Sequence, residues 1–167
     1  MANAIHELLD EVLAAHLISS ELEPYLMAPV ERTQLDVFWG SRNAHRFLYD
    51  VYTWRGGMDV VRQHKDDIWT CLLIEFDFVP PDYLLYVWDV HRTVASPFTP
   101  HERVNIWRDD WTPVFVLAGA EDTLAVDPDG AIWWVTSDGV DLVSPSPEEL
   151  LRHAARRLLA GERERLF

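Results

Sequence analysis

The alternation of hydrophobic and polar positions is clearest in the last third of the chain. Hydrophobic runs of β-type composition occupy residues 111–117, 122–126, 131–136 and 140–143. Turn residues separate these runs, and two of the turns, Pro128-Asp129-Gly130 and Ser137-Asp138-Gly139, are typical of connections between hairpin strands. The pattern predicts a meander of antiparallel strands.

A capped helix is predicted to follow the strands. Ser146, Pro147 and Glu149 match a helix start, with an N-cap serine, a proline in the first turn and a glutamate three residues after the cap. Arginines toward the other end suit the negative end of the helix dipole. We expect the apolar side chains at helical spacing to face the core: Leu151, Ala154, Ala155, Leu158 and Leu159.

Helical periodicity also fills the first third of the chain. Residues 4–17 carry apolar side chains at three- and four-residue spacing. A short helical turn is predicted over residues 21–26, and a longer helical region over residues 30–52. Gly40-Ser41 interrupts this longer region, with Ser41 as a possible N-cap of its second half, and the paired Gly56-Gly57 ends it.

The middle of the chain has a less decisive pattern. Residues 69–79 alternate apolar and acidic side chains and predict a strand, which Pro80-Pro81 ends. Residues 83–90 fit either a strand or one buried helix, and their aromatic and branched side chains slightly favour the strand. Residues 94–108 are predicted as loop. The fold class is therefore α+β: an antiparallel or mixed sheet packed with N-terminal helices and a C-terminal helix.

Composition adds one strong feature, which is negative charge. The chain of 167 residues has 28 acidic and 14 basic residues, a net charge of −14. Lys and Arg are absent between Arg108 and Arg152, whereas five of the 14 basic residues fall in the last 16 positions. Such a protein attracts basic partners and repels phosphate backbones, so direct binding of nucleic acid is disfavoured. The alternative is that the acidic surface serves solubility alone.

Targeting signals are not found in the sequence. No apolar run is long enough to cross a membrane, and the N-terminus lacks the basic and apolar segments of a secretory signal. The single Cys71 cannot form an internal disulfide, which fits a reducing compartment. We expect a cytoplasmic protein with one domain over residues 1–167 and no membrane partner.

The search for catalytic chemistry gives no consistent site. Seven histidines are scattered without paired metal-ligand spacing. His64, Asp66 and Asp67 form the densest polar cluster, which could hold a cation or a general base, or could be a solvated loop. Cys71 lies among apolar residues and is expected in the core, and Asp127 begins a tight turn rather than a calcium loop. We expect no catalytic residue, no bound metal and no cofactor.

The adjacent Trp133 and Trp134 lie within a predicted strand. Successive side chains on a strand point to opposite faces of the sheet. If helices cover one face only, one of the two tryptophans is exposed or contacts a partner, as interface anchors do. If other segments cover both faces, both tryptophans belong to the core.

Two sets of residues share their order with a known family. In the last third these are Trp111, Pro113, Val114, Phe115, Leu124, Val126, Asp127, Gly130, Ile132, Trp133, Ser146 and the helix 150–159. Upstream they are Phe47, Leu48, Tyr52, Trp54 and Gly56-Gly57, an aromatic helix ended by a glycine turn. This order resembles the SUKH superfamily over residues 30–160, and residues 80–108 depart from the family's usual short form.

The resemblance implies an α+β fold without catalytic residues. Bacterial members serve mostly as immunity proteins that neutralise toxins, often nucleases, and fungal members are scaffolds in cell-wall signalling. The high ratio of Arg to Lys, 13 to one, is typical of a GC-rich, bacterial genome. The leading hypothesis is therefore an immunity protein for a basic toxin domain. The alternatives are a regulatory or scaffold domain that binds an endogenous protein, and a small metal-dependent hydrolase.

The residues predicted to meet the protein partner are acidic, with one tryptophan. They are Asp109, Asp110, Glu121, Asp122, Asp127, Asp129 and Trp134.

Overall fold

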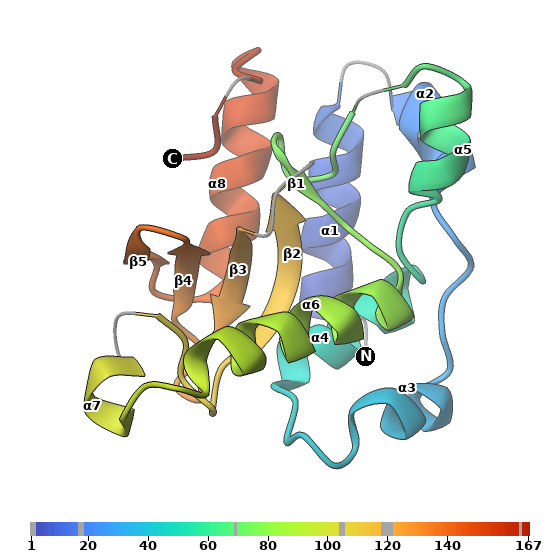
Figure 1. The fold of residues 1–167 in the computed structure, drawn as a ribbon. Coiled ribbons are helices and arrows are strands. Elements are labelled where there is room, and N and C mark those ends of the chain that lie inside the picture. The colour runs from blue at the N-terminus through green and yellow to red at the C-terminus, as the bar shows by residue number, and fades with distance from the viewer. Residues whose placement is uncertain (1–2, 17–18, 69, 104–105, 118–121, 164) are drawn as a thin grey trace.

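A computed structural model describes residues 3–16, 19–68, 70–103, 106–117, 122–163 and 165–167. Its centre is a five-stranded sheet in which every neighbouring pair of strands is antiparallel. Helix α6 (Pro81–Ala95) crosses one face of the sheet, and helices α1 (Ala4–Ala15) and α8 (Pro147–Leu159) pack together on the other face (Figure 1). The predicted α+β class is confirmed.

The strands follow one another in the sheet in the order of the sequence. They are β1 (Phe76–Asp77), β2 (Thr112–Leu117), β3 (Thr123–Val126), β4 (Ile132–Thr136) and β5 (Gly139–Ser144). The last four form the meander predicted from the turn residues. A register shift falls between Pro113 and Phe115 in the pairing of β2 with β3. Proline has no N–H for the ladder, which explains a bulge at this position.

Helix α8 begins as its capping residues predict. The Ser146 hydroxyl accepts a hydrogen bond from the backbone N–H of Glu149 at 3.2 Å, and Pro147 occupies the first turn. The buried stripe contains Leu151 and Leu158. The expectation that Leu159 faces the core is wrong, because 75% of its surface is exposed. One position beyond Leu158 is a rotation of about 100° around the helix, which carries this side chain off the stripe.

The N-terminal helices follow the predicted ranges, with two corrections: a helix at residues 60–65 was not predicted, and the second half of the long helical region has a different cap. They are α1, α2 (Ser19–Leu22) with the 3₁₀ turn η1 (Glu23–Tyr25), α3 (Arg32–Trp39), α4 (Arg46–Trp54) and α5 (Val60–Lys65). Ser41 does not cap the second half of the long helical region. Helix α4 starts five residues later, where His45 Nδ1 accepts a hydrogen bond from the backbone N–H of Phe47 at 3.2 Å.

The predicted glycine turn after α4 is confirmed by close packing of the backbone. Gly57 has a φ of +112°, and a Cβ added there would lie 2.8 Å from the Cα of Pro80. Only glycine combines this positive φ with so close a neighbour. The turn thereby brings the end of α4 against the segment that starts α6.

The middle of the chain differs from its predicted structure. Residue 69 of the strand expected over residues 69–79 lies outside the described residues, and of residues 70–79 only Phe76–Asp77 pairs in the sheet. Isolated bridges join Cys71 to Ile74 and Leu73 to Phe76, and Ile74 has a φ of +61°. The segment before β1 therefore folds back on itself. The loop expected over residues 94–108 contains the end of α6 and the short helix α7 (Pro100–Arg103).

The slight preference for a strand over residues 83–90 is wrong, because these residues belong to α6. Leu84, Val87 and Trp88 are buried at helical spacing, whereas Tyr83 and Tyr86 are exposed on the other side. An amphipathic stripe of this kind packs a helix on a sheet. Among the described residues, no helix combines the length and the apolarity that a membrane crossing requires.

Both faces of the sheet are covered at the paired tryptophans of β4. Trp133 stacks on Trp111, with 5.3 Å between the ring centroids. The ring centroid of Trp134 lies 5.9 Å from that of Phe76 and 6.3 Å from that of Phe167. Both tryptophans are partly buried and pack against the core. Of the two interpretations of this pair, the one in which protein covers both faces is the one observed.

Candidate functional site

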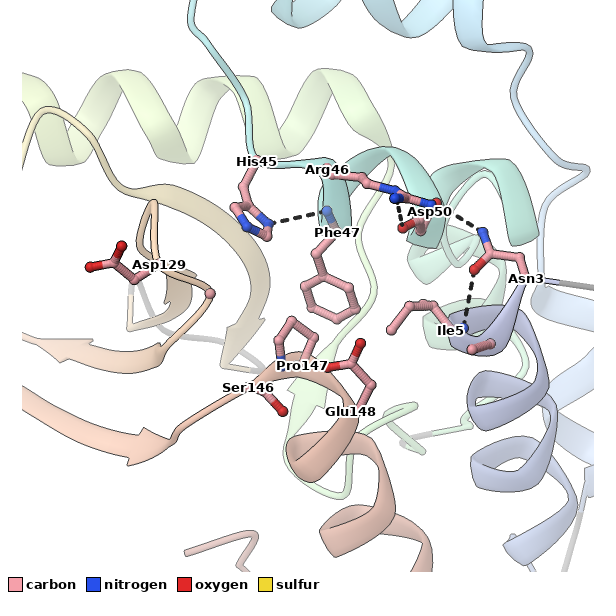
Figure 2. A pocket seen from close by; sticks show the side chains of 12 residues that line it. Asn3, Ile5, His45, Arg46, Phe47, Asp50, Asp129, Ser146, Pro147 and Glu148 are labelled. Atoms are coloured by element: carbon pink, nitrogen blue, oxygen red, sulfur yellow. Dashed lines mark hydrogen bonds and ion pairs between the residues drawn. The ribbon is translucent and has the colours of Figure 1, made fainter.

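A cleft of about 690 Å³ opens where three helices begin. The N-terminal ends of α1, α4 and α8 meet there, and the turn between β3 and β4 closes one side (Figure 2). We name this hollow the N-terminal cleft. Its lining is Asn3, Ala4, Ile5, His45, Arg46, Phe47, Asp50, Asp129, Gly130, Ser146, Pro147 and Glu148.

Each of the three helices is capped by a side chain in this lining. Asn3 accepts from the backbone N–H of Ile5 at 3.1 Å, while His45 and Ser146 cap α4 and α8 as described above. The first N–H groups of a helix have no partner within the helix, so such caps stabilise its start. The three caps therefore fix the walls of the cleft.

The floor of the cleft is apolar and its rim carries charge. Phe47 points from α4 toward Pro147 and Ile5 in Figure 2. On one wall Asp50 accepts a hydrogen bond from Asn3 at 2.8 Å and pairs with Arg46 at 3.5 Å. Because Asp50 already has these partners, the carboxylates of Asp129 and Glu148 are the groups in the cleft that a basic side chain could contact.

Charges in the cleft nearly cancel. Its side chains include three carboxylates, those of Asp50, Asp129 and Glu148, and one guanidinium, that of Arg46. Each helix N-terminus contributes about half a positive charge, so the three ends offset most of the excess of carboxylates. Burial lowers the pKa of His45, although the nearby carboxylates of Asp127, Asp50 and Glu148 act in the opposite direction. A lowered pKa favours the neutral imidazole that caps α4.

Asp127, one of the predicted partner-binding residues, lies inside the molecule. Its carboxylate accepts from the backbone N–H groups of Asp129 and Ala131 at 3.0 and 2.9 Å, and from Trp133 Nε1 at 2.9 Å. Only 8% of its surface is exposed. The residue organises the turn after β3 and presents no carboxylate to a partner, which agrees with the tight turn predicted here.

The other predicted acidic residues do not form one patch. Asp109 and Asp110 are exposed before β2, and Asp129 is exposed after β3, so they share one end of the sheet. Asp129 lines the N-terminal cleft, whereas Asp109 lines a separate hollow along α6 with Asp89 and Arg92. Asp110 accepts from Arg108 at 3.2 Å.

Asp122 lies at the opposite end of the same strands. It precedes β3, close to the turn between β4 and β5, where the backbone of Ser137 donates to it. Burial raises the pKa of Asp122, and the carboxylate of Asp138 adds to the shift. Glu121 falls outside the described residues. Trp134 is half-buried and packs against Phe76 and Phe167.

The polar cluster at His64 has other contacts in the described part of the chain. No group of three or more His, Cys, Asp or Glu side chains suited to a metal was found among the described residues. Asp66 instead accepts from the Tyr25 hydroxyl at 2.9 Å and pairs with Arg62 at 3.7 Å. Cys71 is buried as expected, and burial raises the pKa of its thiol.

Sequence reasoning missed the N-terminal cleft as a feature. Of the three caps that define it, only Ser146 was recognised, because it alone is followed by the proline and the glutamate of a capping box. The cleft also depends on residues from four separate segments of the chain. Their meeting is a property of the tertiary structure.

Comparison of the chain with protein-family models found no matching family, and a search of curated proteins found no match either. The resemblance to the SUKH superfamily therefore stays a prediction.

Proposed function

We propose that this chain is a non-catalytic protein-binding module, an immunity protein of the SUKH type that neutralises a basic toxin domain. The observation that carries the proposal is the net charge of −14 together with exposed carboxylates where β2 begins and β3 ends. Charge of one sign steers an oppositely charged protein into encounter. We name this end of the sheet, with Asp109, Asp110 and Asp129, the acidic end.

The N-terminal cleft supplies an anchor at the acidic end. Its floor of Ile5, Phe47 and Pro147 suits the aliphatic stem of an arginine or lysine from the partner. The carboxylates of Asp129 and Glu148 on the rim suit the charged head of that side chain. The helix ends offset much of the negative charge inside the cleft. The long-range attraction therefore comes from the net negative charge of the whole molecule, and the cleft contributes shape complementarity.

A nuclease is the kind of toxin that this charge distribution fits best. A nuclease binds its substrate through a positively charged surface that neutralises phosphates. A negatively charged protein that covers this surface competes with nucleic acid for the same groups. The chain needs no catalytic residue for this role.

The first test is neutralisation of a defined toxin. The toxic domain encoded beside the gene for this chain is expressed in a heterologous host, with and without the chain. We expect growth to be restored and a complex of the two proteins to be purified. A neighbouring toxin that kills equally well in the presence of the chain would contradict the proposal, and a complex with an endogenous protein alone would favour the scaffold alternative.

The second test compares the effect of charge reversal at the two ends of the sheet on the rate of association. Reversal of the acidic end by Asp109→Lys, Asp110→Lys and Asp129→Lys should slow association roughly tenfold at low salt and flatten its salt dependence. The matched control carries Asp122→Lys, Asp138→Lys and Asp141→Lys, the same charge change away from the acidic end. Stopped-flow association rates that fall equally in both variants would show that net charge alone acts, without a defined surface.

A further inference from the structure

One edge of the sheet is unpaired in the described part of the chain. Strand β5 pairs with β4 on one side, and no described segment pairs with it on the other side. It is the outermost strand of the sheet in Figure 1. The strand at the opposite edge, β1, has only two residues and therefore offers little backbone for pairing. We name the unpaired side of β5 the open edge.

The register of the β4–β5 hairpin shows which backbone groups face the open edge. In an antiparallel pair of strands, hydrogen-bonded and non-hydrogen-bonded residue pairs alternate. Thr136 and Gly139 flank a two-residue turn and form a hydrogen-bonded pair, so Asp141 is the next residue of β5 that bonds to β4. Val140 and Leu142 occupy the alternate positions, and their N–H and C=O groups point away from β4. The open edge therefore presents two donors and two acceptors.

Apolar side chains accompany these backbone groups. Val140 and Leu142 are two positions apart, so their side chains lie on the same face of the sheet. Leu142 is 57% exposed and Val140 is half-buried. Asp141 lies between them and points to the other face. A further strand beside β5 would cover the exposed part of Leu142, because directly opposed side chains of neighbouring strands contact each other.

The charge along the open edge is negative. Asp138 and Asp141 are exposed, and their carboxylates form no ion pair or hydrogen bond with the described residues. Strand β5 contains neither a lysine nor a proline, two residues with which natural edge strands prevent further pairing. A strand that placed a basic side chain opposite Asp141 would gain a favourable cross-strand pair.

The simplest alternative is that Asp141 only protects the edge from aggregation. A charge on an edge strand is one way in which proteins prevent edge-to-edge pairing. This charge acts against a second copy of the chain, which carries the same aspartates and the same net charge of −14. It does not act against a basic segment, which it attracts. The charge of the open edge thus disfavours self-association and favours a basic partner.

We propose that the open edge binds an extended basic segment of a partner protein, which adds a strand to the sheet beside β5. The backbone groups of Val140 and Leu142 supply the hydrogen bonds, as in other complexes formed by strand addition. Alternate side chains supply the selectivity, with apolar side chains against Leu142 and a lysine or arginine opposite Asp141. The open edge lies away from the acidic end, so it can be occupied whether or not a toxin binds there.

The test titrates the full chain with the acetylated and amidated peptide Lys-Val-Lys-Val-Lys and follows the backbone amides by ¹H–¹⁵N NMR. The peptide should shift the Val140 and Leu142 N–H resonances until they saturate and should slow hydrogen exchange at both. Exchange at Asp141, which already bonds to β4, should change less. The same peptide with glutamate in place of each lysine should not bind.

Three outcomes would overturn the proposal. The first is the absence of a saturable change at Val140 and Leu142. The second is equal affinity for the acidic peptide, which would contradict a basic partner. The third is a dimer in analytical ultracentrifugation that protects the same two N–H groups without peptide, since a second copy would then occupy the open edge.

Matched variants separate the open edge from general charge. Leu142→Lys removes the apolar contact, adds a like charge beside the peptide and should weaken peptide binding about fivefold. Leu159→Lys makes the same change at an exposed leucine of α8 away from the open edge and should leave affinity nearly unchanged. Asp141→Asn should weaken binding about threefold through loss of the cross-strand pair. Equal weakening by Leu142→Lys and Leu159→Lys would show that net charge alone acts and would contradict the site.

Discussion

Single buried polar side chains determine the geometry of this protein at several points. Asp127 ties the turn after β3 to the indole of Trp133, and the His16 ring contacts the Leu72 carbonyl oxygen beyond the end of α1. Both residues are polar but almost fully buried. A buried polar group stabilises a fold only when its hydrogen bonds are made. Asp127, which was predicted to meet a partner, therefore has a structural role.

Removal of the Asp127 carboxylate should destabilise the fold. Asp127→Ala leaves Trp133 Nε1 and two backbone N–H groups without their acceptor, which we expect to cost about 2 kcal/mol or more in the free energy of unfolding. Asp129→Ala in the same turn removes an exposed carboxylate and should change stability by less than about 0.5 kcal/mol. Urea unfolding measures both, and equal losses would contradict the structural role of Asp127.

The buried histidines predict how stability depends on pH. Burial lowers the pKa of His16 and of His45 in the folded state, so the unfolded chain takes up a proton at a higher pH than the folded one. The contribution of these two histidines to the free energy of unfolding is therefore present above the ordinary histidine pKa of 6.5. It is lost as the pH falls below 6.5 toward the lowered pKa of the folded state.

His16→Gln tests this pH dependence. The amide can still bond to the Leu72 carbonyl but does not titrate, so this variant should lose less stability than the wild type between about pH 7.5 and pH 5.5. His101→Gln changes an exposed histidine and should keep the wild-type dependence. A wild-type pH dependence in His16→Gln would contradict the assignment.

At the scale of elements, the sequence predicts the C-terminal meander and its helix well and the middle of the chain poorly. Turn residues and a capping box are local signals, and the segment from β2 to α8 is built from them. Residues 83–90 have no such signal, and a short apolar run fits a strand and a buried helix equally. Contact with β2 decides between the two, since α6 packs its buried stripe there.

The start of α8 offers a test at this scale. Ser146→Ala removes the acceptor for the Glu149 N–H and should reduce the free energy of unfolding by about 1 kcal/mol. Ser137→Ala, in the exposed turn between β4 and β5, is the matched control and should have little effect. Thermal or chemical unfolding that shows no difference between the two variants would exclude a stabilising cap.

At the scale of the whole molecule, acidic and basic side chains gather at different places along the strands of the sheet. Exposed carboxylates lie where β2 begins, and Arg157, Arg163 and Arg165 lie together at the far end of α8. The predicted set of partner-binding residues mixed both ends, because sequence distance does not show which end of a strand a residue occupies. Antiparallel pairing places Asp110 and Asp129 at one end and Asp122 at the other.

The excess negative charge should make stability depend on salt. Self-repulsion opposes the compact state of a strongly charged chain, and salt screens it over about 10 Å at 0.1 M. We therefore expect the midpoint of thermal unfolding to rise as sodium chloride increases from about 0.01 M to 0.3 M. A midpoint that falls over this range would show that favourable ion pairs outweigh the repulsion.

The sequence by itself determined the α+β class, the meander and its capped helix, the burial of Cys71 and the negative net charge. These follow from composition and from patterns within a few residues, where local geometry acts alone. Only the tertiary structure decided that Asp127 is internal, that Trp133 and Trp134 both pack against the core, and that the N-terminal cleft exists. The cleft and the contacts of the two tryptophans join side chains distant in sequence, whereas Asp127 bonds to neighbours within six positions. In each case the burial depends on how other segments pack on the two faces of the sheet.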